Sequence, residues 1–217
     1  VTGVQTCALP IWLSAEHGRE VGIIPEIKSS TYLHGLGLDP ESELVRLVDA
    51  YGLNAPEAPM WVQSFEVGNL RALREEHGYR ARLILLMTVH GGPFDLVAEG
   101  TSSSDLLRPE ALGELARWID GIGPDKSLVI PREADGSLGQ PSSVVRDAHA
   151  AGLLVMPWTF RAENSFLPTD LRVGDHLSHF GRAIDEVRIF LEADVDGIFC
   201  DQPDIGLVAR ADFLGTS

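Results

Sequence analysis

The sequence predicts an α/β fold. More specifically, it predicts a truncated (β/α)8 TIM barrel with about six of the eight βα units present. Short apolar runs alternate with amphipathic segments along the chain, a pattern typical of parallel strands joined by helices. No glycine-rich phosphate loop follows any of these runs, which disfavours an open doubly wound sheet. The 217 residues also fall short of a complete barrel of roughly 250 residues.

Six segments have the features of buried strands. They are short, apolar and bounded by glycine, proline or polar residues. The clearest is ARLILLMT, a nearly continuous apolar run, as expected for a strand that is covered on both faces. The six predicted strands are 21–28, 60–64, 81–88, 120–124, 153–159 and 197–201.

A helix is predicted after each strand. In the first helix, apolar side chains recur at helical spacing between Leu44 and Val48, and Gly52 marks its end. Two long stretches, 90–108 and 125–140, are predicted loops, and the first is long enough to be functional. The six predicted helices are 40–51, 66–77, 109–119, 141–151, 175–193 and 203–210.

The charge balance narrows the range of partners. A formal net charge of −15 argues against binding to nucleic acid or to an anionic membrane, and the sequence has no basic cluster. No apolar run approaches the roughly 20 residues of a membrane span. We therefore expect no nucleic acid partner and no membrane span. An acidic protein that handles a phosphate ester needs a local cation to offset its own field, which favours a metal site.

The first residues are expected not to be native. VTGVQTCALPI reads as an in-frame translation of a common sequencing-library adapter, so we assign 1–12 to an adapter-derived segment and 13–217 to a partial barrel domain. On this interpretation the first two βα units and any targeting signal are missing from the front. Cys200 is then the one native cysteine, and its apolar surroundings predict a buried structural thiol.

The segment VGIIPEIK carries the clearest chemical signal. Glu26 and Lys28 are two residues apart on a predicted strand, so their side chains project to the same side near its carboxyl end. In a barrel, that end forms the mouth of the active site. Two interpretations stand: a metal-binding Glu26 beside a phosphate-facing Lys28, or a structural ion pair in the barrel interior.

Three other residues at strand ends have both a functional and a structural interpretation. Gln63 could hydrogen-bond a polar substrate or satisfy backbone groups of the adjoining loop. Trp158 could form an apolar wall for a ligand or belong to the core. Asp201 could face the mouth, but we favour a role as cap of the helix that follows Pro203.

The histidines form no catalytic pattern. His34, His90 and His149 are isolated, and a lone histidine is more often structural or exposed than catalytic. His176 and His179 are three residues apart on a predicted helix, with no third ligand at useful spacing. We therefore interpret that pair as part of a solvated helix face.

Five motifs in order, VGIIPEIK, WVQSFE, DGIGPD, VMPWTFR and DGIFCDQPD, resemble the glycerophosphodiester phosphodiesterase family, most closely its long-loop bacterial branch of periplasmic or secreted enzymes. The resemblance runs from about Gly22 to Val208. It implies a TIM barrel that hydrolyses a small-molecule glycerophosphodiester to sn-glycerol 3-phosphate and an alcohol. It also implies a divalent metal, calcium first and magnesium as the alternative, and a periplasmic or secreted location.

The resemblance assigns roles to four residues. The family's PEIK glutamate, a metal ligand, matches Glu26, and the lysine beside the phosphate, a catalytic residue, matches Lys28. The glutamine of the QSF-type strand matches Gln63, and the aromatic residue of the PWT-type strand matches Trp158. Both are expected to contact substrate, whereas the closing segment 201–204 is expected to be mainly structural.

Other essential features of the family have no counterpart in this sequence. These are a His-Arg-Gly strand end, a Glu-x-Asp pair of metal ligands and a second histidine; the two histidines are the general acid and base. We therefore expect the 217-residue chain to be inactive. We also expect it to fold poorly by itself, because an open barrel leaves two unpaired sheet edges. Two other hypotheses are a non-catalytic barrel that binds glycerophosphodiesters, and a different barrel enzyme acting on a phosphorylated metabolite. The second is disfavoured, because PWTFR and CDQPD stand where glycine-rich phosphate loops are usual.

Overall fold

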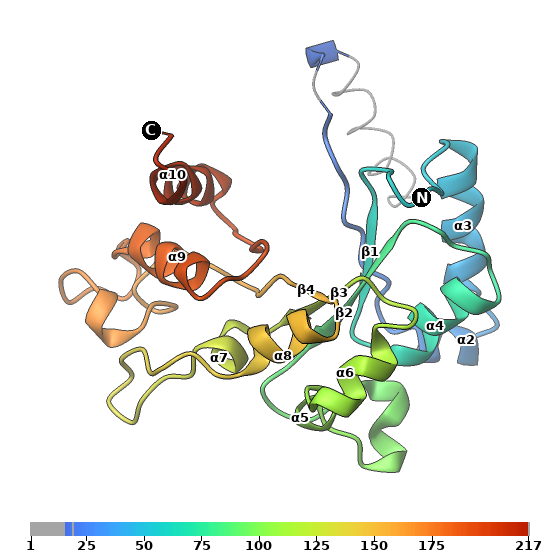
Figure 1. Ribbon diagram of the computed structural model, residues 1–217, viewed down its shortest axis with the longest axis horizontal. Coiled ribbons are helices and arrows are strands. Elements are labelled where there is room, and N and C mark those ends of the chain that lie inside the picture. Colours follow the sequence, from blue (N-terminus) through green and yellow to red (C-terminus); the bar gives the residue numbers. More distant parts are fainter. Residues whose placement is uncertain (1–15, 19, 217) are drawn as a thin grey trace.

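A computed structural model describes residues 16–18 and 20–216 of the chain and shows an α/β architecture built on a parallel sheet (Figure 1). The strands are neighbours in sequence order, and every neighbouring pair is parallel, as expected when each strand is followed by a helical crossover. The four strands are β1 (Trp61–Ser64), β2 (Arg82–Met87), β3 (Gly121–Pro124) and β4 (Leu154–Val155).

Two further segments extend this sheet, one on each side, through isolated parallel bridges. The bridges are Ile23–Met60 and Glu26–Gln63 beside β1, and Phe160–Cys200 beyond β4. Six parallel segments therefore follow one another in the predicted order. The first is too irregular to form a continuous strand, because Pro25 has no N–H to donate in the ladder beside β1.

The alternation of side chains along the strands divides them between two faces. Leu83, Leu85 and Ile122 belong to the main hydrophobic core under the helices. Gln63 pairs in register with Ile84 on the neighbouring strand, and both lie on the opposite face. Glu26 pairs with Gln63 and so shares that face.

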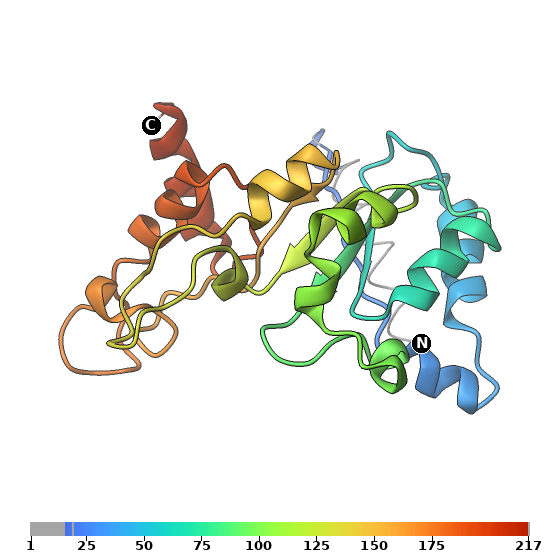
Figure 2. The same ribbon diagram turned by 60° about the horizontal axis from the view of Figure 1, so that its bottom comes forward.

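The helices follow the strands along one side of the sheet, as Figures 1 and 2 show for α3, α4, α6 and α8. None of the described helices is long and apolar enough to cross a membrane. The α-helices are α2 (Ser30–Gly35), α3 (Pro40–Ala50), α4 (Val67–Glu75), α5 (Ser103–Leu106), α6 (Pro109–Leu115), α7 (Lys126–Val129), α8 (Val144–Ala150), α9 (Ala183–Glu192) and α10 (Pro203–Leu214), and the 3-10 helices are η1 (Phe94–Glu99) and η2 (Thr169–Leu171).

The predicted helix over 175–193 is wrong in its first half, since α9 begins only at Ala183. The preceding residues form a loop that the buried Asn164 holds. Its amide Nδ2 donates to the carbonyl oxygens of Val173 at 2.8 Å and of His176 at 2.9 Å. The rings of His176 and His179 therefore stack within a loop, with centroids 4.8 Å apart, and not on a helix face.

Candidate active site at the carboxyl ends of the strands

Glu26 and Lys28 lie at the carboxyl end of the first sheet segment and face the same side, as predicted. Lys28 Nζ is 3.6 Å from Glu26 Oε2, and the two side chains are 76% and 20% exposed, respectively. A pair this open to water stabilises a fold by at most about 1 kcal/mol. The structure thus gives no support to a structural ion pair buried in the interior, and it leaves Lys28 free to meet a ligand.

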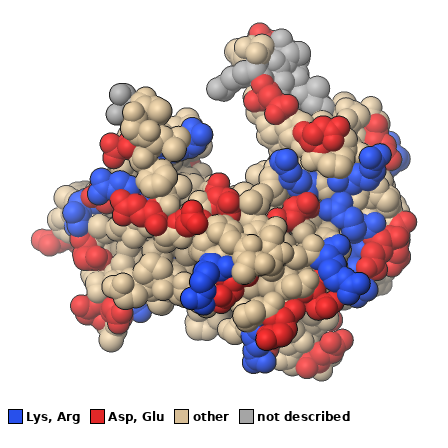
Figure 3. Space-filling model, in the orientation of Figure 1, with Lys and Arg blue, Asp and Glu red and all other residues tan. Residues whose placement is uncertain are grey.

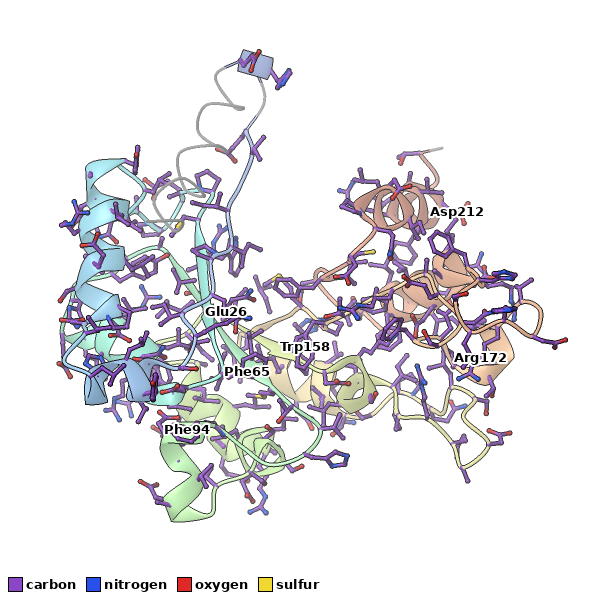
Figure 4. All side chains as sticks on the ribbon, turned by 180° about the vertical axis from the view of Figure 1, so that it is seen from behind. Glu26, Phe65, Phe94, Trp158, Arg172 and Asp212 are labelled. Carbon is purple, nitrogen blue, oxygen red and sulfur yellow. The ribbon has the colours of Figure 1, made fainter. Side chains whose placement is uncertain are left out.

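Both side chains line a cavity of about 500 Å³, which is large enough for a small ligand. Its wall combines the charged pair with the aromatic rings of Tyr32, Phe65 and Phe94. In Figure 4, Glu26 and Phe65 lie close together in the middle of the molecule, and Phe94 lies towards its lower edge. The cavity therefore offers charge at the strand ends and apolar surface around it.

Polar contacts from the end of β1 hold the backbone on both sides of Lys28. Ser64 Oγ donates to the Ile27 carbonyl oxygen at 3.1 Å. Glu66, which is 4% exposed, accepts hydrogen bonds at Oε2 from Thr31 N at 2.9 Å and from Thr31 Oγ1 at 2.5 Å. The turn that presents Lys28 is thereby attached to the neighbouring strand.

Gln63 lies beside Glu26 in the sheet. Its side-chain oxygen Oε1 is buried and accepts no hydrogen bond from the described residues. A buried polar atom without a partner is unusual, and a donor group or a cation at this position would satisfy it. The predicted contact of Gln63 with substrate stays a prediction.

Trp158 follows β4 and reaches across the sheet towards β1. Its indole Nε1 donates to the Gly123 carbonyl oxygen at 2.7 Å, and its ring makes an edge-to-face contact with Phe65 at 5.6 Å between centroids. Trp158 lines a separate cavity of about 390 Å³. The structure therefore brings Glu26 and Lys28 into one cavity, and Trp158 contacts Phe65, which lines that cavity (Figure 4).

The predicted capping role of Asp201 is wrong. Gln202 occupies the N-cap position of α10, and no side chain caps that helix. Asp201 instead forms an ion pair with Arg161, in which Oδ2 lies 2.5 Å from Nε without the alignment of a hydrogen bond. Cys200 is half-buried, its Sγ donates to the Gln202 carbonyl oxygen at 3.1 Å, and burial raises the pKa of the thiol, which fits a structural cysteine.

The sequence interpretation missed several residues of this site, among them Phe65, Glu66 and Phe94. Phe65 and Glu66 stand in the motif WVQSFE, directly after β1, so their position at a strand end was a usable signal. Phe94 belongs to the predicted loop 90–108, which is long enough to be functional. No sequence signal indicated that this aromatic ring would reach the cavity of Glu26.

The donors around Glu26 suit a hard divalent cation. They are the Glu26 carboxylate and the unpartnered Oε1 of its neighbour Gln63, and calcium and magnesium both prefer oxygen ligands. Calcium takes 6–8 oxygen ligands, so these two donors would be part of a larger set. Among the described residues, the one group of three close metal-ligating side chains lies elsewhere, at His34, Asp39 and Glu41.

The fold and the site define the class of protein: an α/β domain of parallel strands with a polar site at the carboxyl ends of its strands, where β/α barrels carry their active sites. Residues 16–205 match the Glycerophosphoryl diester phosphodiesterase family. The chain belongs to this family.

Two relatives show how far the likeness extends. A glycerophosphodiester phosphodiesterase of Haemophilus influenzae is 22% identical over 216 residues, which cover 90% of this chain and 54% of that protein. Glycerophosphodiester phosphodiesterase GDPD6 of Arabidopsis thaliana is 26% identical over 206 residues, which cover 88% of this chain and 51% of that protein. The chain thus spans about half the length of the curated relatives it matches.

Solved structures confirm the predicted fold class. One similar structure is that of a protein from Silicibacter pomeroyi DSS-3, which is described provisionally as a glycerophosphoryl diester phosphodiesterase. It has a TM-score of 0.61 and 19% sequence identity, and the match covers 97% of this chain and 56% of that one. A protein from Agrobacterium tumefaciens C58 with the same provisional description has a TM-score of 0.52 and 16% identity over 91% of this chain and 60% of that one. At this identity the likeness concerns the fold alone.

Proposed function

We propose that the whole protein hydrolyses glycerophosphodiesters to sn-glycerol 3-phosphate and an alcohol, with a divalent metal, calcium before magnesium. The observation that carries this proposal is the pair Glu26 and Lys28 on the wall of one cavity at the strand ends. Family membership supports the same reaction. The resemblance to the long-loop branch is the basis for proposing a periplasmic or secreted location.

Each candidate residue has a distinct task in this proposal. The Lys28 ammonium offsets the charge that develops on the non-bridging phosphoryl oxygens. Glu26, with Gln63 Oε1 beside it, holds the metal, which when bound supplies Lewis-acid polarisation of the phosphoryl group. Trp158 and Phe65 give the glycerol moiety an apolar wall.

Proton transfer to and from the attacking and leaving oxygens needs a general acid and a general base. The family's two histidines for this role have no counterpart in the sequence of this chain. We therefore propose that the 217-residue chain alone has no turnover, and that Lys28 and Glu26 act together with groups outside it.

The test is release of glycerol 3-phosphate from glycerophosphocholine by the complete protein, with and without a chelator. Lys28→Met and Glu26→Gln are each expected to lower kcat/KM by roughly 100-fold or more, since each removes charge stabilisation in the transition state. Glu57→Gln, at an exposed position outside the site, serves as the control. Full activity in the Glu26 and Lys28 variants, or in excess chelator, would refute the proposal.

A non-catalytic barrel that binds glycerophosphodiesters is the second candidate. Under this alternative, the complete protein keeps the pocket of Glu26 and Lys28 but lacks the family's two histidines. Binding of glycerophosphocholine by the complete protein without any release of glycerol 3-phosphate would establish this alternative.

A further inference from the structure

A second group of metal-ligating side chains lies outside the candidate active site, in the turn between α2 and α3. His34 is in the last turn of α2, Asp39 is the N-cap residue of α3, and Glu41 is in the first turn of α3. Each offers one ligand atom, and the three atoms lie within 4.8 Å of one another. His34 Nε2 and Glu41 Oε2 are only 2.7 Å apart.

Glu41 is the buried carboxylate of this group. It is 1% exposed, and its oxygens contact Ser30 Oγ at 2.5 Å and His34 Nε2. No lysine or arginine in the described part of the chain forms an ion pair with it. Because a buried carboxylate is costly unless it is paired with a cation or coordinates a metal, a hydroxyl and an imidazole are weak compensation.

The surroundings of Glu41 concentrate negative charge further. A cavity of about 260 Å³ beside it is lined by four carboxylates and two imidazoles, with no lysine or arginine among the described residues of its wall. Asn69, which is 6% exposed, lines the same cavity, and its Oδ1 accepts no hydrogen bond from the described residues. A bound cation would offset the charge of the carboxylates and the unsatisfied acceptor together.

His77 places a second imidazole at this location. It follows α4, lines the same cavity, and its Nδ1 lies 3.4 Å from Ser42 Oγ, which in turn lies 2.5 Å from Asp39 Oδ2. Two imidazoles with two carboxylates are donors typical of zinc and similar divalent transition metals, whereas calcium and magnesium select oxygen ligands.

We propose that His34, Asp39 and Glu41, with His77 as the fourth ligand, bind a divalent transition metal of the zinc class. Zinc lies about 2.0–2.2 Å from such ligands, so the ligand atoms of a tetrahedral site are roughly 3.3 Å apart. The ligand atoms of His34, Asp39 and Glu41 lie within 4.8 Å of one another, so these three need only small side-chain movements to reach that geometry, whereas His77 has to turn towards them from its position beside Ser42. Four protein ligands leave no open position, so the site is structural: it fastens α2, just after the Lys28 turn, to α3 and to the end of α4.

The test is a titration of the complete protein, metal-free and without a histidine tag, with zinc by calorimetry and with cobalt(II) by visible absorption. We expect one zinc per chain and the intense absorption bands of tetrahedral cobalt(II). Asp39→Asn keeps the helix cap, since asparagine is an equally good N-cap residue, but removes the charged ligand. It is expected to weaken zinc binding at least roughly tenfold with unchanged far-UV circular dichroism. His34→Ala is expected to abolish the cobalt bands.

Two control variants show whether zinc binds at this cluster and not at another part of the chain. His90→Ala removes an exposed histidine of the 90–108 loop and should leave zinc binding unchanged. Glu26→Gln should also leave it unchanged, so failure of the phosphodiesterase proposal does not affect this one. Zinc binding that is absent, that is equal in wild type, Asp39→Asn and His34→Ala, or that calcium displaces at equal concentration overturns the assignment.

Discussion

Tyr79 carries a polar group that the fold does not use. The side chain is 1% exposed, and its hydroxyl has no hydrogen-bond partner in the described structure. Burial raises the pKa of this phenol, so it stays neutral across the physiological range. Tyr79→Phe removes the unsatisfied hydroxyl and keeps the ring, so we expect the free energy of unfolding to rise by about 1 kcal/mol or stay unchanged. Urea denaturation measures this, and a clear loss of stability would reveal a partner for the hydroxyl.

Lys126 and Glu186 form a buried ion pair whose partners depend on each other. Lys126 Nζ lies 2.7 and 2.9 Å from the two Glu186 oxygens, and the side chains are 11% and 1% exposed, respectively. Burial lowers the pKa of Lys126 and raises the pKa of Glu186, while the attraction between them opposes both shifts.

Breaking this pair is expected to be far more costly than replacing it. Glu186→Gln leaves the Lys126 ammonium buried without a counter-charge, and we expect a loss of about 3–5 kcal/mol in the free energy of unfolding. The double variant Lys126→Met with Glu186→Leu is expected to lose much less, because no buried charge remains. Equal losses in the two variants, measured by urea denaturation, would contradict this account.

Single residues differ in how far the sequence predicts them. That Glu26 and Lys28 share a face follows from the two-residue period of a strand, which is a local property. The capping role of Asp201 failed because Arg161, distant in sequence, competes for the same carboxylate. Sequence patterns contain local information such as the period of a strand. They do not contain which side chain, distant in sequence, will pair with a given carboxylate.

The same distinction holds for helices and strands. The predicted helices 40–51 and 66–77 agree with α3 and α4 to within about two residues at each end, as is usual for such assignments. The segment 175–182 carries residues compatible with a helix, but the distant Asn164 binds its backbone in a loop conformation. Similarly, Pro25 interrupts the predicted first strand, because it has no N–H to donate to β1.

The short helix α5 gives a prediction at the scale of an element, through its capping box. Asp105 accepts hydrogen bonds from Ser102 Oγ and Ser102 N, and these hold the pKa of Asp105 below its ordinary value of 3.8. A carboxyl group with a lowered folded-state pKa stabilises the fold above its unfolded-state pKa, and this stabilisation is lost as the pH falls through the folded-state value.

We therefore expect Asp105→Asn to lower the melting temperature near neutral pH, with a difference from wild type that shrinks once the pH falls below 3.8. Thermal unfolding followed by circular dichroism across the acid range measures this difference. Ser102→Ala removes the hydroxyl partner and should reduce the same pH dependence. A difference between wild type and Asp105→Asn that stays constant with pH would exclude the carboxylate as its source.

At the scale of the whole molecule, the order of the strands was predictable and the contacts at the ends of the sheet were not. Alternating strands and helices predict parallel neighbours in sequence order, because each crossover returns the chain to the next position in the sheet. Among the described residues, the sheet ends at segment 22–27 on one side and at segment 199–201 on the other. In the view of Figure 3, acidic and basic side chains are interspersed over the described surface.

This architecture leaves apolar surface exposed to solvent on the last two helices, α9 and α10. Helix α10 packs on α9, and a groove of about 560 Å³ beside them is lined largely by aliphatic and aromatic side chains. Leu207 is 66% exposed and Phe213 is 43% exposed on α10. Exposed sheet edges and apolar patches both promote association between chains.

We therefore expect the isolated 217-residue chain to self-associate as its concentration rises, because contact between copies removes this surface from water. Light scattering coupled to size-exclusion chromatography over a range of concentrations measures the effect. The double variant Leu207→Glu with Phe213→Glu should shift the association to higher concentration without loss of helical signal, whereas Glu57→Gln should not. A wild type that stays monomeric at all concentrations would mean that the apolar surface of α10 is covered within the chain itself. A double variant that associates as wild type does would mean that the sheet edges, and not α10, drive the contact.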